Sequence, residues 1–376
     1  MKIKKIDVLH LSVPLKKPYK LSKLYGTLYT TEPVVVKITT DEGMVGVGET
    51  DPMPLFTGET AETAVTVIHN YLAPALIGKD PTNIACIHHI MDGVIRDMHL
   101  AKAAVDMACY DIMGKAAGMS VATLLGGRIH DSLPIMGSIG GGTPEDNARE
   151  AVSLIEDKGY ASLMVKIGSD DYMYDAERTI AIAKAVGDKV VLIPDANQGW
   201  DVTTTLKYLD AVSGCNVDAF EQPIHAGDID GFAKIKQGTN VKLTADESLL
   251  SLEHAKMMIK EKSVDIFSIK VCKTGGIYRS KEIIELSRHF GIQCLFNSMI
   301  EEGITQAASF ALGCSTRNLY AHGHAYFSPL RLEDDITNFS TFIKNGRINV
   351  PDTPGLGIEV DDEKLAHYTK DRYKIV

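Results

Sequence analysis

Between residues 133 and 325, short apolar runs alternate with segments of helix length. Segments such as TPEDNAREAVSLIEDKG and SLEHAKMMIKEK separate the runs and have the spacing of amphipathic helices. Repeated strand–helix units form parallel sheets, and eight of them predict a closed (β/α)-barrel. A doubly wound open sheet is the alternative, disfavoured because no G-x-G-x-x-G follows the first strand of either region. The strand-like runs are LPIMGSIG, ASLMVKIG, KVVLIPDANQ, VDAFEQP, VKLTADES, VDIFSIKV, GIQCLFNS and NLYAHGHA.

The chain on either side of this repeat has a different pattern. The first fifty residues contain the apolar runs VVVKITT and MVGVGE, separated by a turn at Asp41-Glu42-Gly43. Two alanine-rich stretches with helical spacing follow, and each ends at a glycine. The tail has Pro and Gly turns and no further strand–helix unit, so we expect it to fold back onto the first domain. The predicted domains are an α+β cap (1–125), a barrel (126–330) and a returning tail (331–376).

Composition limits the classes of partner. The 376 residues carry a net charge of −10 and are 45% hydrophobic, which is typical of a soluble protein with a sizeable core. This charge offers no basic surface for nucleic acid or an anionic membrane. The first residues, MKIKKIDVLHLSV, are interrupted by polar side chains and favour a strand over a signal peptide or membrane span. The six scattered cysteines form no C-x-x-C pair, so we expect reduced thiols and a cytoplasmic protein.

Charged residues end the central barrel runs in a regular order. Lys166, Asp195, Glu221, Asp246 and Lys270 recur at intervals of 24 to 29 residues, about one strand, helix and loop. Residues that end successive barrel strands converge on one face, where barrel enzymes build their active sites. Each carboxylate alone also has a local interpretation: Asp195 and Asp246 as helix caps, and Glu221 as loop surface.

The convergence of all three carboxylates favours a metal site. Clustered carboxylates repel one another and hold protons unless a cation neutralises them. Oxygen ligands without Cys or His suit a hard ion such as Mg²⁺. Lys166 and Lys270 would then act as acid and base. Near a bound cation and each other their ammonium forms are disfavoured, and catalytic lysines reach a pKa of roughly 7–8 in this way.

Motifs along essentially the whole chain resemble those of the enolase superfamily, in its muconate lactonizing enzyme subgroup. They are DANQGW, FEQP, TADES, SIKVCKTGGI and PGLGIEV. The resemblance implies a modified TIM barrel, (β/α)7β, with an amino-terminal α+β cap completed by the carboxyl-terminal tail. It implies one Mg²⁺ per subunit, for which Mn²⁺ can substitute, bound by Asp195, Glu221 and Asp246. It also implies the acid/base pair Lys166 and Lys270.

The same resemblance implies further site positions. Asn197 and Glu247 would support the metal site, and Glu301, in MIEEGI, would line or brace the pocket. A mobile lid over residues 15–30 would contribute Leu24 and Tyr25. His322 and His324 alternate on one strand and favour a pocket or packing role over a transition-metal site, because no third soft ligand is evident. The remaining predicted contacts are Ser138, Met164, Asn297, Ser298 and Phe327.

The sequence departs from the subgroup in two places. Met164 stands where the Lys-x-Lys of the second strand normally begins. Dipeptide epimerases carry Asp-x-Asp near the end of strand eight, where this chain has Ala325-Tyr326-Phe327. No carboxylate pair is therefore expected for a free ammonium. A lysine in place of a histidine opposite Lys166 disfavours the mandelate racemase branch.

These features predict an enzyme that removes a proton α to the carboxylate of a small molecule. A racemase or epimerase of an N-substituted amino acid is the leading hypothesis. Three alternatives stay open: a muconate-type cycloisomerase, supported by MIEEGI, an acid dehydratase, and a non-catalytic ligand-binding relative. The resemblance also implies a homo-oligomer, often of eight subunits.

Overall fold

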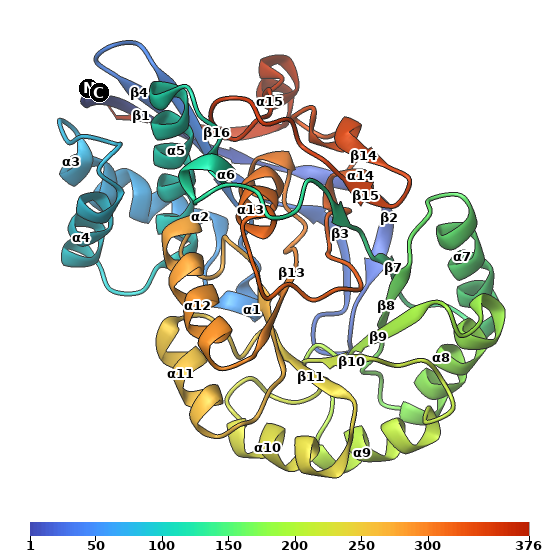
Figure 1. The fold of residues 1–376 in the computed structure, drawn as a ribbon. Helices are drawn as coiled ribbons and strands as arrows, with labels where there is room; N and C mark the ends of the chain where they lie inside the picture. The colour runs from blue at the N-terminus through green and yellow to red at the C-terminus, as the bar shows by residue number, and fades with distance from the viewer. Residues whose placement is uncertain (376) are drawn as a thin grey trace.

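An antiparallel sheet built from both ends of the chain forms the base of the cap. The computed structural model describes residues 1–375 (Figure 1). In the sheet, β1 (Ile3–Leu11) lies between β16 (Thr369–Ile375) and β4 (Val34–Thr40), and β5 (Val45–Thr50) forms the far edge. The predicted turn at Asp41-Glu42-Gly43 joins β4 to β5. The predicted return of the tail to the cap is confirmed, because β16 pairs with β1.

Helices cover this sheet, and glycines let the longest one approach closely. α5 (His99–Ala117) packs on β5, where a Cβ at Gly48 would lie 1.8 Å from the carbonyl oxygen of Ala104. The stretch predicted as one helix, residues 60–78, is interrupted by a π-helical turn just before Pro74, a residue that cannot donate a helical hydrogen bond. The other cap helices are α1 (Pro54–Thr57), α2 (Ala61–Val67), η1 (Ile68–Leu72), α3 (Ala73–Leu76), α4 (Ile84–Val94) and α6 (Val121–Leu124).

The segment predicted as a lid is a two-stranded hairpin. β2 (Val13–Lys20) pairs with β3 (Thr27–Thr31), and a turn over residues 21–26 joins them. Tyr19 donates to or accepts from Ser138 of the barrel, with 2.6 Å between the hydroxyl oxygens. The hairpin therefore contacts the barrel directly.

Seven parallel strands form the barrel sheet, in sequence order, with helices along its outer rim (Figure 1). The strands are β7 (Gly137–Ile139), β8 (Ser162–Lys166), β9 (Val191–Asp195), β10 (Ala219–Glu221), β11 (Lys242–Ala245), β12 (Ile266–Ile269) and β13 (Gln293–Phe296). The helices are α7 (Pro144–Glu156), α8 (Tyr172–Val186), α9 (Val202–Ala211), α10 (Ile229–Gly238), α11 (Leu252–Lys260), α12 (Ile277–His289) and α13 (Gly303–Cys314).

The eighth predicted run, NLYAHGHA, closes the ring without forming a regular strand. Leu319 bridges to Cys294 of β13, and His324 bridges to Ile135 just before β7. Gly323 interrupts the run with a φ of +141°, which side-chain-bearing residues rarely adopt. The expected strand is thus two isolated bridges. The run LPIMGSIG is also divided, because β6 (Leu133–Pro134) joins β14 (Ile343–Lys344) and β15 (Arg347–Ile348) in a separate small sheet.

One carboxylate ties the cap to the barrel. Glu49, near the end of β5, accepts hydrogen bonds from the backbone N–H groups of Glu302 (2.7 Å) and Thr305 (2.9 Å) at the start of α13. These N–H groups have no partner inside the helix, so Glu49 supplies the cap. The remaining helices are α14 (Ser328–Arg331), η2 (Phe339–Phe342) and α15 (Asp362–Tyr368). Within residues 1–375, no helix is long and apolar enough to cross a membrane.

Candidate active site

Five charged side chains lie where the central barrel strands end. Lys166 and Glu221 both pair in register with Asp195, so the last residues of β8, β9 and β10 are neighbours. Asp246 and Lys270 immediately follow β11 and β12. Each of the five is at most 9% exposed. Buried charges at this density need partners, which the lysines and carboxylates provide for one another.

Lys166 pairs with the neighbouring strand. Its Nζ donates to Asp195 Oδ2, and it also lies 3.3 Å from Asn197 Oδ1. Burial alone would lower the pKa of Lys166, but the Asp195 carboxylate outweighs burial and raises it. In this state Lys166 is an ammonium.

Lys270 is held in the same way from the other side. Its Nζ lies 2.7 Å from Asp246 Oδ2 and 4.1 Å from the centre of the Phe56 ring, a cation–π distance. Burial tends to lower the pKa of Lys270. The charges of Asp246, Glu247 and Glu221 outweigh burial, so the pKa lies above its usual value. In this arrangement Asp195 and Asp246 lie beside lysine ammonium groups, whereas the expected lowering of the lysine pKa values applies to a site that holds a cation and stays a prediction.

A third lysine, Lys273, was missed by the sequence analysis. It is 1% exposed, and its Nζ donates to both the backbone carbonyl and Oδ1 of Asp246. Burial, together with the charge of Lys270, lowers the pKa of Lys273. Burial tends to raise the pKa of Asp246, but the two ammonium groups hold it below its usual range. The signal was present as the second lysine of SIKVCKTGGI, three residues after Lys270.

Glu221 and Glu247 lack comparable cationic partners. Asn297 Nδ2 donates to Glu221 Oε1 (2.7 Å), whereas Oε2 is buried without a partner. Burial and the charges of Asp195 and Asp246 raise the pKa of Glu221 well above its usual value. Burial and the same two aspartates raise the pKa of Glu247 to about 8, and its Oε1 accepts from Asn197 Nδ2 (3.2 Å). Both glutamates are thus poised to gain from an added cation.

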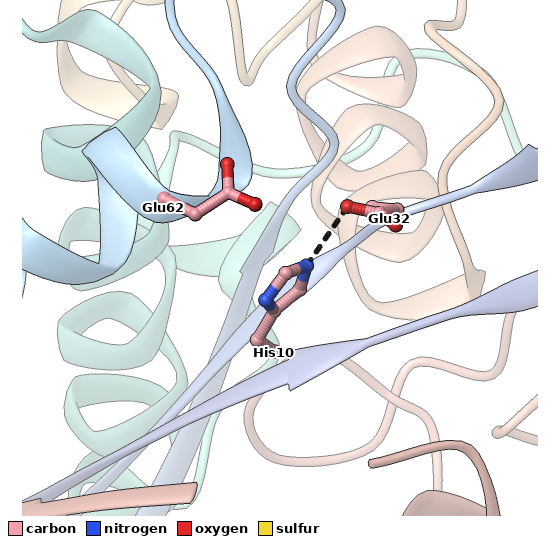
Figure 2. A group of neighbouring side chains, drawn as sticks. All are labelled: His10, Glu32 and Glu62. Carbon is pink, nitrogen blue, oxygen red and sulfur yellow. Dashed lines mark hydrogen bonds and ion pairs between the residues drawn. The ribbon is translucent and has the colours of Figure 1, made fainter. Parts of the chain in front are cut away.

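The three predicted metal ligands do not share one compact set of oxygen atoms here. Asp195 is turned toward Lys166, and Asp246 toward Lys270 and Lys273. Among residues 1–375, three or more ligand atoms lie within 4.8 Å of one another only in the cap, at His10, Glu32 and Glu62 (Figure 2). A metal ion bound by these three carboxylates would therefore replace the contacts that Asp195 and Asp246 now make with lysines.

A small pocket of about 40 Å³ lies over the charged cluster, and both lysines line it. We call it the central pocket. The cap closes it from above with Tyr19, Leu21, Tyr25, Met53 and Phe56. The barrel contributes Met164, Lys166, Asn197, Lys270, Asn297, Ser298, Met299, Ile300 and Phe327. Six residues predicted for the site besides the lysines line it: Tyr25, Met164, Asn197, Asn297, Ser298 and Phe327. Ser138 does not line it but hydrogen-bonds to Tyr19, which does.

Family models match the chain on both sides of the cap–barrel boundary. Residues 4–126 match the mandelate racemase / muconate lactonizing enzyme amino-terminal domain, and residues 146–364 match the enolase carboxyl-terminal domain-like model. The second match covers more than half of the chain.

The chain belongs to the enolase superfamily. Its curated relatives place it in the muconate lactonizing enzyme subgroup. An N-succinyl-L-Arg/Lys racemase of Bacillus cereus is 36% identical over 98% of both chains, and its crystal structure has a TM-score of 0.96 over the full length of both. A chloromuconate cycloisomerase of Cupriavidus necator is 32% identical over 98% of this chain and 100% of its own.

A solved dipeptide epimerase of Enterococcus faecalis, complexed with Mg and L-Leu-L-Tyr, is 31% identical, with a TM-score of 0.90 over 96% of this chain and 100% of its own. All three relatives are isomerases, and this chain is an isomerase of the same superfamily.

Within the superfamily barrel, Glu301 shapes the loop after β13. Its carboxylate accepts from the Ser298 hydroxyl and from the backbone N–H groups of Met299 (2.6 Å) and Ile300 (3.0 Å). Ile300 has a φ of +130°, a strained value for a β-branched residue. Glu301 thus holds Ile300 at the wall of the central pocket without lining it.

The structure places several predicted residues away from the central pocket. His324 is fully buried; it accepts from the backbone N–H of Phe296, and burial lowers its pKa to about 3. His322 lies beside Asp218, which precedes β10, so it is at the opposite end of the barrel. Leu24 is 45% exposed, and Glu247 contacts Asn197 beneath the pocket. His324 thus has the packing role, one of the two roles predicted for it, and neither histidine lines the central pocket, because the eighth run is not a regular strand.

Proposed function

We propose that this superfamily member is a Mg²⁺-dependent racemase or epimerase of an N-acylated amino acid. The observation that carries the proposal is the position of two lysines in one pocket. Lys166 is the last residue of β8, and Lys270 directly follows β12. The three strands between them, β9, β10 and β11, carry the three carboxylates at or just after their ends. Both lysines line the central pocket. A substrate between them would present opposite faces of its α-carbon to the two amines.

Asp195, Glu221 and Asp246 would hold the metal ion. The fit rests on oxygen donors at three adjacent strand ends, on the unpartnered Glu221 Oε2, and on the raised pKa of Glu221. A bound Mg²⁺ supplies positive charge beside the substrate carboxylate and so favours loss of the α-proton. The Mg complex of the dipeptide epimerase supports the choice of ion.

The two lysines would divide the proton transfers by configuration. One neutral amine removes the α-proton of one enantiomer, and the ammonium on the other side delivers a proton to the opposite face. When a cation takes over Asp195 and Asp246, Lys166 and Lys270 lose the partners that now raise their pKa values. The same exchange of partners would therefore assemble the metal site and release an amine as base.

The pocket walls favour a substrate whose amino group carries no charge. Met164, Ile300 and Phe327 are apolar, and within residues 1–375 the pocket lining has no Asp or Glu. An amide nitrogen can lie against such a wall, whereas an ammonium there would be desolvated without a partner. The N-succinyl-L-Arg/Lys racemase supports this class.

The test is α-proton exchange in D₂O with Mg²⁺, using each enantiomer of an N-succinyl amino acid. Lys166→Ala should lose exchange from one enantiomer and Lys270→Ala from the other, while the wild type exchanges both. If one substitution stops all exchange and the other leaves it intact, the two-base proposal is wrong.

A cycloisomerase is the second candidate, favoured by the chloromuconate relative. A cycloisomerase needs only one of the two lysines as acid. Turnover of cis,cis-muconate followed by absorbance, with no exchange on N-succinyl amino acids, would select it.

A further inference from the structure

A histidine and two glutamates from three separate elements meet in the cap (Figure 2). His10 is in β1, Glu32 directly follows β3, and Glu62 is in the first turn of α2. One ligand atom from each residue lies within 4.8 Å of the other two. We call this group the cap triad. Its three members do not line the central pocket, so the cap triad is a site of its own.

The imidazole of His10 distinguishes the cap triad from an ordinary acidic surface patch. His10 is only 3% exposed, although the two glutamates reach solvent. Its Nε2 lies 3.1 Å from Glu32 Oε2, and Figure 2 shows the Glu62 carboxylate directed toward the same space. The triad therefore offers one nitrogen and two oxygen donors to a single point. Imidazole nitrogen suits Zn²⁺ and other transition metals, whereas Mg²⁺ and Ca²⁺ prefer oxygen ligands.

The charges around His10 favour a dication. A hydrogen bond from its own backbone N–H lowers the pKa of Glu62, so this side chain is ionised. Asp371 of β16 pairs in register with His10 and adds a third carboxylate beside the triad. Lys370 is the opposing charge, but its Nζ lies 3.4 Å from Glu32 Oε1, whereas His10 contacts Oε2. Three carboxylates and one ammonium leave the site negative while His10 is neutral.

Open space lies on two sides of the cap triad. His10 and Glu62 line a cavity of about 300 Å³, and Glu32 and Glu62 line another of about 290 Å³. Either cavity has room for several water molecules. A zinc ion with three protein ligands commonly takes a water molecule as its fourth. The two cavities can therefore supply the ligand that completes a tetrahedral set.

We propose that the cap triad binds one transition-metal dication such as Zn²⁺, through His10 Nε2 and one carboxylate oxygen each of Glu32 and Glu62. The proposal goes beyond the proposed function and does not depend on it, since the triad takes no part in proton transfer. The ion would join β1, the end of the β2–β3 hairpin and α2. It would thus fix the base of the hairpin that covers the central pocket.

The experiment is a Zn²⁺ titration by isothermal calorimetry, in excess Mg²⁺ so that the proposed barrel site is filled. The wild type should bind one equivalent of Zn²⁺ per chain. His10→Asn should weaken binding by at least the roughly 10- to 100-fold that follows loss of a group supporting a metal ligand. His367→Asn removes an exposed histidine of α15 and should keep the wild-type affinity. Glu221→Gln should also keep it, because this variant alters only the barrel.

A second variant guards against misfolding at the buried histidine. Glu62 is exposed, so Glu62→Gln should fold and should also weaken Zn²⁺ binding. Hydrogen–deuterium exchange with and without Zn²⁺ locates the ion, because exchange should slow in residues 27–32 and 61–67 and stay unchanged in the barrel. No Zn²⁺ binding by the wild type, unchanged affinity in either folded triad variant, or protection confined to the barrel overturns the site.

Discussion

At the residue scale, the site is a set of buried charges that neutralise one another in pairs. Asp195 is paired with Lys166, and Asp246 lies between Lys270 and Lys273, while Glu221 has only the amide of Asn297. Glu221 is therefore the carboxylate with most to gain from a metal ion. The charges of Asp195 and Asp246 add to burial in raising its pKa.

Glu221→Gln should abolish the stabilisation of the fold by Mg²⁺. In the wild type, Mg²⁺ at 100 times its Kd should stabilise the fold by about 2.7 kcal/mol, which raises Tm. The variant should show no Mg²⁺-dependent shift. Without metal its Tm should be at least that of the wild type, because one member of a repelling group has become neutral. Differential scanning calorimetry with and without Mg²⁺ measures both, and equal Mg²⁺ shifts in the two proteins would contradict the assigned ligand.

Asp51 should make stability fall as pH rises. Its pKa is about 7 in the folded protein and near 4 in an unfolded chain. Between these values unfolding releases a proton, so the free energy of unfolding decreases with pH by up to about 1.4 kcal/mol per unit. Asp51→Asn should remove this slope between pH 5 and 6.5, as measured by urea unfolding. Parallel pH profiles for the two proteins would show that Asp51 is already ionised in the fold.

At the element scale, the β2–β3 hairpin controls the entry of substrate into the central pocket. A space of about 40 Å³ holds a few water molecules and no amino acid derivative, so the hairpin has to move for substrate to enter. Three hydroxyl contacts hold it against the barrel: Tyr19 to Ser138 (2.6 Å), Ser22 to the Asn197 carbonyl (3.1 Å) and Tyr25 to Gln198 (2.8 Å).

Tyr25→Phe should loosen the hairpin without removing the ring that packs near Phe56. One hydrogen bond of about 1 kcal/mol corresponds to roughly fivefold faster amide exchange in residues 20–28. Hydrogen–deuterium exchange followed by mass spectrometry measures this change. Tyr29→Phe is the matched control, since Tyr29 is 65% exposed on the same hairpin. Equal protection in wild type and Tyr25→Phe would mean that the hydroxyl contact does not hold the hairpin closed.

Much of this architecture could be predicted from periodicity, and the exceptions have physical causes. Seven of the eight barrel runs became parallel strands because each is apolar and bounded by turns. The eighth is interrupted at Gly323, and the two histidines that flank this glycine do not line the central pocket. Met53 and Phe56 were missed because the segment around α1 has no periodic pattern. The choice of Asp195 and Asp246 as lysine partners depends on contacts between strands, which a single sequence does not specify.

At the scale of the whole molecule, we expect a homo-oligomer. Large apolar side chains of the cap are exposed, with Tyr29 at 65%, Leu55 at 64% and Leu24 at 45%, and such residues are frequent in subunit interfaces. Multi-angle light scattering at micromolar concentration should give a multiple of 40.9 kDa. A mass of one subunit would contradict the expectation.

The pairing of β1 with β16 has a consequence for synthesis on the ribosome. Translation produces β1 early and β16 late, so one edge of β1 stays unpaired while the intervening chain is made. An open edge invites pairing with other nascent chains. A transcript truncated before Thr369 would thus yield a chain with an intact barrel sequence but a β1 edge that stays unpaired and prone to aggregation. Cellular quality control would have to remove such a chain.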